Sequence, residues 1–379
     1  MRIVIAPDAF KGTIGAEAAA AALGEGWSRG RPGDDIVALP LADGGEGTLD
    51  AMARAVPGAV RVPVLGAPGP DGRPVDTAWL RLPDGTGVVE LAAVSGLPLM
   101  AAPDAMRAHT AGLGTVLAAA LGAGVSALVV AVGGSASTDG GTGVLAALGA
   151  RFHGCDGKEL PYGGGSLARL AAIDSTRLAT PPPGGVQILT DVTNPLLGPT
   201  GAAAVFGPQK GASAREIAEL DAGLARLATL LGGTPAAPGA GAAGGTAYGL
   251  ATAWNAAIVP GAPRVAELAG LPAALADADL VITGEGRFDA TSTHGKVVGA
   301  VLDLARRGTG VPVALVAGSI AAPLPTGVST SADLTRLAGS ATAAQTDAAH
   351  WLRLAGATMA GRFDADRAAR TRRDPLDQP

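Results

Sequence analysis

Hydrophobic positions near both ends of the chain form short continuous runs that alternate with Ala-rich or amphipathic stretches. The runs predict buried strands and the stretches between them predict helices. The predicted elements are strands over 3–6, 35–41, 279–283 and 312–317, and helices up to about Gly24, over 45–55 and over 296–307. Strands that alternate with helices are typical of a parallel sheet. We therefore expect the late strands to join the first two in one doubly wound sheet.

The pattern changes in the middle of the chain. Runs at 60–64, 75–82 and 87–91 are split by Pro-Asp-Gly and Asp-Gly turns, which indicates an antiparallel meander. Helix–strand alternation then resumes, with helices predicted over 108–121 and 214–231 and strands over 127–132 and 186–190. The middle is therefore predicted to be an inserted second α/β domain. After about Asp364 the charged tail is expected to fray.

Composition narrows the class of protein. Of the 379 residues, 48% are hydrophobic, which is enough for a large core, and the net charge of −5 argues against a nucleic-acid partner. A single cysteine, Cys155, permits no intramolecular disulfide. Glycines cut the longest uncharged stretch, 108–138, into segments too short to cross a bilayer. We expect a soluble cytoplasmic protein with no membrane partner.

Charged and hydroxyl residues gather at five glycine-rich junctions, each of which follows a strand or opens a helix. The junctions are 6–12, 42–48, 133–141, 190–195 with 207–211, and 283–289 with 294–296. In open α/β sheets, ligands bind where strands end and helices begin. Only four of the 28 basic residues are lysines, and three of them, Lys11, Lys210 and Lys296, lie in these junctions. This placement indicates ammonium groups near phosphates or carboxylates.

Several familiar sites are excluded. No G-x-x-x-x-G-K-[ST] or G-x-S-x-G motif occurs, and the four histidines lack metal-ligand spacing. Gly239–Gly244 matches G-x-G-x-x-G, but no strand precedes it, which argues against a dehydrogenase. Acids and lysines on glycine loops remain. Phosphoryl transfer needs that combination, because N–H groups and lysines bind phosphates, carboxylates hold Mg²⁺, and one carboxylate orients the attacking hydroxyl.

At these residues the sequence resembles the type I bacterial glycerate kinase family. The matching stretches are APDAFKGT (6–13), ADGGEGT (42–48), GGSASTDGG (133–141), DVTNPLLG (191–198), GAAAVFGPQKGA (201–212), GAGAAGG (239–245) and VITGEGRFD (281–289). The departures are small: Ala9, Ser137-Thr138 and Phe288 replace the family's usual residues. The resemblance implies a Rossmann-like domain over 1–60 plus 258–379, interrupted by an inserted domain over 61–257. The active site is expected in the cleft between them.

The resemblance also implies transfer of the ATP γ-phosphoryl group to D-glycerate with Mg²⁺, giving 2-phosphoglycerate. The expected catalytic residues are Asp191, Lys11 and Asp8. Residues expected to bind ATP phosphates are Gly133, Gly134, Ser135, Lys210, Gly284, Gly286 and Lys296. Residues expected to bind the substrate are Asp43, Glu46, Asn194 and Arg287, and Glu285 is a metal candidate. A metal role also stays open for Asp43 and Glu46, and contact with the substrate carboxylate for Lys210 and Lys296. For Asp139 and Asp289, helix capping and catalysis both stay open.

Two other functions stay open. The same kinase reaction at the C3 hydroxyl would give 3-phosphoglycerate, and a sugar-acid sensor of the same fold class would bind glycerate without ATP turnover. The sequence leaves the oligomeric state open.

Overall fold

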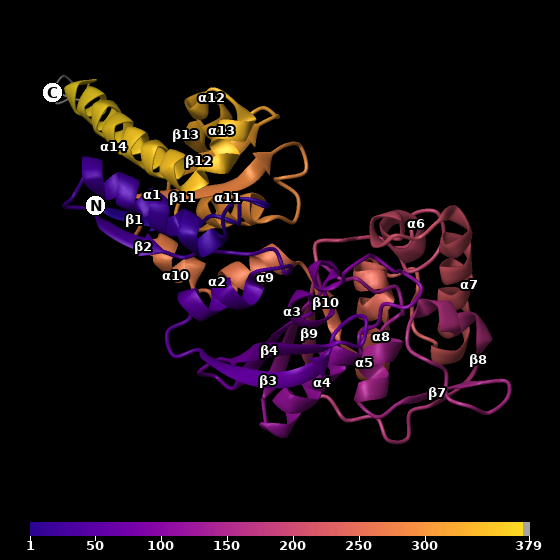
Figure 1. Cartoon of the computed structure of the whole chain (residues 1–379). Helices are drawn as coiled ribbons and strands as arrows, with labels where there is room; N and C mark the ends of the chain where they lie inside the picture. The colour runs from indigo at the N-terminus through magenta and orange to yellow at the C-terminus, as the bar shows by residue number, and fades with distance from the viewer. Residues whose placement is uncertain (374–379) are drawn as a thin grey trace. The chain divides into compact units, whose positions relative to one another are not determined.

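A computed structural model describes the backbone of residues 1–373 and the side chains of residues 1–363. The chain divides into two compact units. Unit 1 consists of Met1–Asp43, Asp50–Pro57 and the described chain from Ala262 on. Unit 2 consists of Gly44–Leu49 and Gly58–Gly261. Figure 1 shows the elements of both units, and each unit is described by itself.

Unit 1 is built on a five-stranded sheet in which every neighbouring pair is parallel. The strand order is β13-β12-β11-β1-β2. Its strands are β1 (Arg2–Ile5), β2 (Asp35–Ala38), β11 (Leu280–Phe288), β12 (Val313–Ile320) and β13 (Val328–Asp333). Because β1 lies between β2 and β11, the predicted pairing of late strands with the first two is confirmed.

Unit 1 also contains α-helices. They are α1 (Ala16–Gly30), α2 (Thr48–Ala55), α9 (Gly261–Leu268), α10 (Leu271–Ala276), α11 (Val297–Gly308), α12 (Leu334–Ala338), α13 (Ala341–Thr346) and α14 (Ala348–Arg373). The core on one face joins Ile3 and Ile282 of the sheet to Trp27 of α1 and Leu352 of α14, all fully buried. The buried side chains of α11, such as Val301, belong to a helix that packs on β11. Burial of these apolar surfaces stabilises the unit.

Unit 2 contains a mixed six-stranded sheet with the order β10-β9-β6-β5-β4-β3. The pairs β3–β4 and β4–β5 are antiparallel, which confirms the predicted meander, and the other pairs are parallel. A separate hairpin pairs β7 with β8. The strands are β3 (Val60–Pro68), β4 (Pro74–Arg81), β5 (Thr86–Glu90), β6 (Ala127–Ala131), β7 (Arg151–Gly154), β8 (Leu170–Asp174), β9 (Val186–Leu189) and β10 (Ala257–Val259).

The α-helices of unit 2 are α3 (Ala92–Ser95), α4 (Ala111–Gly122), α5 (Thr142–Ala147), α6 (Ala202–Phe206), α7 (Ala214–Leu231) and α8 (Thr246–Trp254). Short 3₁₀ helices are η1 (Leu97–Leu99), η2 (Gly164–Arg169), η3 (Pro208–Lys210) and η4 (Ala242–Gly245). The predicted helix over 214–231 has the observed bounds of α7, because Ser213 and Glu216 form a capping box at its start.

Two sequence expectations about elements were wrong. The first helix runs to Gly30 rather than Gly24, since Gly24 and Gly26 are tolerated where the helix packs closely, Gly26 against the Arg353 backbone. The expected junction at 283–289 is strand through Phe288. The backbone after Asp364 continues as helix α14 to Arg373, and the rest of the tail expected to fray, residues 374–379, lies outside the described part, so that expectation stays a prediction.

Candidate active site

A cavity of about 530 Å³ in unit 1 lies where the loop after β1 meets the end of β11. Charged side chains predicted from the sequence gather in its lining. They are Asp8, Lys11, Asp43, Glu285, Arg287, Asp289 and Lys296. In a parallel sheet the carboxyl ends of adjacent strands meet at one edge, which explains why junctions far apart in sequence come together here.

Asp8 is the most perturbed carboxyl group of this cavity. Its residue is only 7% exposed, and its Oδ1 accepts a hydrogen bond from the Ala9 N–H at 2.7 Å. Burial is the main cause that raises the pKa of Asp8 to about 7; the nearby charge of Asp43 contributes to that rise, while the Ala9 N–H hydrogen bond and Lys11 oppose it. The pKa of the Glu285 carboxyl is also raised, mainly by burial. The cavity therefore concentrates acidic groups whose negative charge is costly.

Lys11 lies at the mouth of the same group of acids. Its side chain is 81% exposed, and its Nζ lies 3.8 Å from Asp43 Oδ2. An exposed pair at this distance contributes little to stability. The ammonium group is therefore able to reorient toward an incoming anion at small energetic cost.

Gly284 and Gly286 belong to β11 rather than to a loop. Neither has positive φ. A Cβ on Gly284 would lie 2.1 Å from the Val316 carbonyl oxygen, and one on Gly286 would lie 3.2 Å from the Lys11 nitrogen. Close backbone packing against β12 and the Phe10–Lys11 turn explains both glycines. Their proposed contact with ATP phosphates stays a prediction.

The remaining charges of this cavity come from the end of β11 and the start of α11. Arg287 Nε lies 3.8 Å from Asp289 Oδ2, and Lys296 Nζ donates to Thr291 Oγ1 at 3.1 Å. Asp289 Oδ1 accepts from both the backbone N–H and the hydroxyl of Thr291. For Asp289 the observed contacts are those of a turn-forming residue.

In unit 2, the loop over 133–141 follows β6. Gly134 has φ +77°, a backbone conformation that favours glycine. The N–H groups of Gly134 and Ser135 have no hydrogen-bond partner among the described residues. Successive free N–H groups around a left-handed residue form concave sites for anions. This loop therefore has the backbone chemistry expected of a phosphate-binding element.

Asp139, in the same loop, is a structural residue. Its carboxylate is fully buried, and Oδ2 accepts from the Thr110 N–H, the Thr110 hydroxyl and the Gly143 N–H at 2.8–3.1 Å. Oδ1 accepts from the Gly141 N–H at 3.1 Å. These bonds satisfy backbone donors at the starts of α4 and α5. The capping alternative for Asp139 is thus the one that the structure supports.

Lys210 approaches this loop from η3. Only 2% of the residue is exposed, and its Nζ donates to Ser135 Oγ at 2.8 Å and to the Ser137 carbonyl at 2.5 Å. Burial lowers the pKa of Lys210 to about 7, against the opposing effect of the Asp139 charge. The predicted contact of Lys210 with ATP phosphates stays a prediction. Its observed partners belong to the loop itself.

Asp191 and Asn194 follow β9. Asp191 Oδ1 accepts a hydrogen bond from the Gly261 N–H at 2.9 Å, and Asn194 Nδ2 donates to the Thr200 carbonyl at 2.8 Å. Asp191 belongs to unit 2, whereas Lys11 and Asp8 belong to unit 1. The three predicted catalytic residues are therefore distributed over both units.

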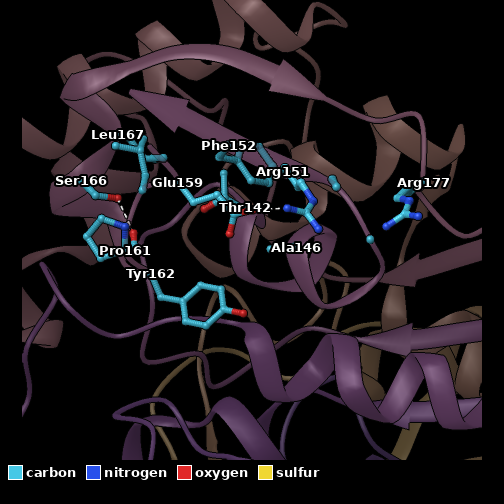
Figure 2. A pocket seen from close by; sticks show the side chains of 13 residues that line it. Thr142, Ala146, Arg151, Phe152, Glu159, Pro161, Tyr162, Ser166, Leu167 and Arg177 are labelled. Atoms are coloured by element: carbon cyan, nitrogen blue, oxygen red, sulfur yellow. Dashed lines mark hydrogen bonds and ion pairs between the residues drawn. The ribbon is translucent and has the colours of Figure 1, made fainter. Parts of the chain in front are cut away.

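A second cavity of about 530 Å³ lies in unit 2, beside the β7–β8 hairpin (Figure 2). Arg151 and Glu159 line it and pair with each other at 2.7 Å. Tyr162 and Arg177 also line this cavity. The lining contains no residue that the sequence assigns to the site.

Comparison with known proteins identifies the family of this chain. A model of the "Glycerate kinase family" matches residues 3–363. The chain belongs to the glycerate kinase family. It is 42% identical over 332 residues to "Glycerate kinase" of Bacillus subtilis strain 168, covering 84% of this chain and 85% of the relative. It is 40% identical over 329 residues to "Glycerate 2-kinase" of Escherichia coli K12, covering 84% and 86%.

A solved structure extends the similarity to the fold. The crystal structure of a "putative glycerate kinase 2" from Salmonella typhimurium LT2 superposes with a TM-score of 0.83 at 36% identity. The alignment covers 97% of this chain and 99% of that one. The family similarity derived from the sequence is thus confirmed, and the chain is a kinase with an α/β fold.

One residue that orders a family motif was missed by sequence reasoning. Glu90, at the end of β5, accepts hydrogen bonds from the Gly47 and Leu49 N–H groups at 3.1 and 2.9 Å. These bonds hold the segment 47–49 to the end of β5 within unit 2, and Glu46 beside it is exposed. The only sequence signal was a glutamate directly after an apolar strand.

Two searches of the described residues were negative. No group of three or more His, Cys, Asp or Glu side chains within that part of the chain is arranged to hold a metal ion. Between residues 1 and 373, no helix combines the length and apolarity needed to cross a membrane.

Proposed function

We propose that this glycerate kinase family member transfers the γ-phosphoryl group of ATP to D-glycerate and forms 2-phosphoglycerate. The observation that carries the proposal is the unit 1 cavity, where Asp8, Asp43 and Glu285 lie with Lys11 at the ends of parallel strands. Phosphoryl transfer requires cations near phosphate oxygens and a carboxylate near the attacking hydroxyl. The names of the similar proteins support glycerate as the acceptor of the phosphoryl group.

The residues present fit a divalent cation that arrives with ATP. Asp43 and Glu285 both raise the pKa of Asp8, so positive charge among these acids would be stabilising. Mg²⁺ typically takes one or two carboxylates and completes its shell with water and phosphate oxygens, which agrees with the absence of a three-residue ligand group among the described residues. Glu285 and Asp43 would hold it. When bound, Mg²⁺ supplies charge that neutralises the phosphate oxygens.

The protein groups have separable tasks in the transfer. Asp191 orients the attacking hydroxyl of glycerate and accepts its proton as the oxygen–phosphorus bond forms. The bond from the γ-phosphorus to the bridging oxygen breaks, and ADP leaves. Lys11 neutralises the transferring group, with Asp8 beside it, and the free N–H groups of Gly134 and Ser135 bind phosphate oxygens. The expectation of an active site in a cleft between two domains stays a prediction.

Two arguments support transfer to the C2 hydroxyl of glycerate: the way the substrate carboxylate would be held, and the name of a similar protein. The primary C3 hydroxyl is less hindered, so transfer to C2 requires that the carboxylate be held close to the reacting centre. Arg287 and Lys296, which share the cavity with the acids, are the groups proposed to hold that carboxylate. The similarity to a protein named glycerate 2-kinase supports C2. Transfer to C3 is the alternative.

The experiment that tests the proposal is incubation of the protein with MgATP and D-glycerate, followed by phosphorus NMR of the products. ADP and a phosphoglycerate must appear together and only when both substrates are present. Binding of D-glycerate without ADP formation would instead support the sugar-acid sensor. A thermal shift with NAD(P) would be the corresponding sign of a dehydrogenase.

A further inference from the structure

A buried lysine lies beneath the loop over 133–141. Lys210 ends η3, and Gly211 directly after it has φ +87°, so the chain turns sharply there. A Cβ at Gly211 would lie 2.9 Å from the Pro103 carbonyl oxygen. The turn is therefore packed tightly. Placing an amine in the interior costs free energy unless its donors are satisfied.

Lys210 donates two hydrogen bonds to the loop. Its Nζ reaches the hydroxyl of Ser135 and the carbonyl of Ser137, which flank Ala136. The Ala136 N–H donates to the Ser95 carbonyl at 3.0 Å, so the centre of the loop is held from two sides. Asp139, two residues beyond Ser137, is held separately by backbone donors.

The unsatisfied donors of the loop lie beside the residue that Lys210 holds. Gly133 N–H is bonded to the Gly44 carbonyl, whereas the N–H groups of Gly134 and Ser135 have no partner among the described residues. Lys210 is thus bonded to the side chain of a residue whose backbone N–H stays available. Donors fixed in advance lose less entropy when an anion binds.

We propose that Lys210 is a positioning residue that fixes the N–H groups of Gly134 and Ser135 for the polyphosphate of ATP without contacting it. The identity of the anion rests on the proposed function. The burial of Lys210 and the use of its donors within the protein explain why it acts through the loop. This differs from Lys11, whose exposed ammonium is free to meet phosphate directly.

The first test compares Lys210→Met with Lys158→Met. Methionine keeps an apolar stem but lacks the two hydrogen bonds, and Lys158 is an exposed lysine of the same unit, with its side chain 85% exposed. Lys210→Met should raise the KM for ATP by about 10- to 100-fold, the scale of a displaced binding group, and leave the KM for glycerate within about twofold. Lys158→Met should change neither.

A second readout does not depend on activity. Amide hydrogen exchange of peptides covering 132–141 should become at least about tenfold faster in Lys210→Met, because the bonds from Gly133, Ala136 and Gly140 then open more often. Peptides of α7 should exchange at the wild-type rate. Faster exchange throughout unit 2, or unchanged exchange over 132–141, would overturn the proposal.

Chemical rescue keeps the test decisive if Lys210→Met is unstable. Lys210→Ala removes three methylene groups and the amine, and n-propylamine has the same atoms. Added propylamine should restore slow exchange over 132–141 and lower the KM for ATP, with no effect on Lys158→Ala. A Lys210→Ala protein that propylamine leaves unchanged would contradict the proposal. Wild-type protein without kinase activity would refute the proposed function, and the exchange data would still show whether Lys210 holds the loop over 132–141.

Discussion

At the scale of single residues, solvent exposure separates the lysines of the glycine-rich junctions. Lys11 is exposed beside the acids of unit 1, whereas Lys210 is buried and hydrogen-bonded within unit 2. Moving an exposed ammonium group to a ligand costs little free energy, whereas moving a buried one breaks its hydrogen bonds within the protein. We therefore propose different tasks for the two lysines.

Substitution of Lys11 by alanine should lower turnover by at least about 100-fold, since a charged contact to the transition state is lost. The melting temperature should change little, because the side chain is exposed and its pairing with Asp43 is loose. Steady-state kinetics and a thermal melt check this, with Lys158→Ala as control. Near wild-type turnover of Lys11→Ala would show that its role is assigned wrongly.

Asp191→Asn should lower turnover by a similar factor, at least about 100-fold. The asparagine oxygen still accepts from the Gly261 N–H, so the local structure should persist while the negative charge is lost. The turnover and the melting temperature of the variant are compared with those of wild-type protein. A drop in melting temperature together with retained turnover would assign Asp191 a structural role only.

At the scale of elements, the connection from α1 to β2 depends on one carboxylate. Asp34, with its side chain 6% exposed, accepts hydrogen bonds from Arg31 Nε at 2.5 Å and Trp27 Nε1 at 2.9 Å. The Arg31 hydrogen bond is the main cause that holds the pKa of Asp34 below its usual range. A lowered pKa contributes stability that is present above the unfolded pKa of about 4 and is lost as the pH falls further.

Asp34→Asn should therefore reduce the free energy of unfolding by about 1–2 kcal/mol at neutral pH. The difference from wild-type protein should shrink as the pH falls below about 4. Urea unfolding of both proteins at a series of pH values measures this difference in the free energy of unfolding. Asp303→Asn, which removes an exposed ion pair with Arg306, should cost less than about 1 kcal/mol. Equal costs for both variants would be inconsistent with this account of Asp34.

The element scale also shows what sequence patterns can predict. The runs at 3–6 and 127–132 are strands because their residues are continuously apolar, as buried parallel strands require. The motif at 283–289 looked like a loop because it contains two glycines and three charges. It is strand because Gly284 and Gly286 pack against neighbouring backbone, a long-range contact that no local pattern contains. The roles of Glu90 and Asp139 likewise depend on partners distant in sequence.

At the scale of the whole molecule, the family and the α/β architecture could be predicted from the sequence. Long motifs and apolar runs can be recognised without knowledge of tertiary contacts. The gathering of Asp8, Asp43 and Glu285 followed from the geometry of a parallel sheet. The burial of Lys210 did not follow, since its neighbours in sequence are ordinary turn residues. Strands β7, β8, β10 and β13 were missed because they are short or polar.

Activity of the whole enzyme should require a divalent cation. Excess EDTA should abolish ATP-dependent phosphorylation, because the acids of the unit 1 cavity and the phosphates of ATP otherwise repel each other. Addition of Mg²⁺ beyond the EDTA should restore activity, and Glu285→Gln should raise the Mg²⁺ concentration needed for half-maximal rate. Full turnover in excess EDTA would contradict the proposed use of these carboxylates.

The most direct test of the central claim is a coupled assay with MgATP, D-glycerate and enolase as the only coupling enzyme. Enolase acts on 2-phosphoglycerate, so phosphoenolpyruvate should form at once if the product carries its phosphate at C2. If phosphoenolpyruvate appears only after phosphoglycerate mutase is added, transfer occurs at C3 and the proposed positioning of the carboxylate is wrong. If ADP never forms from ATP and glycerate, the kinase proposal itself fails.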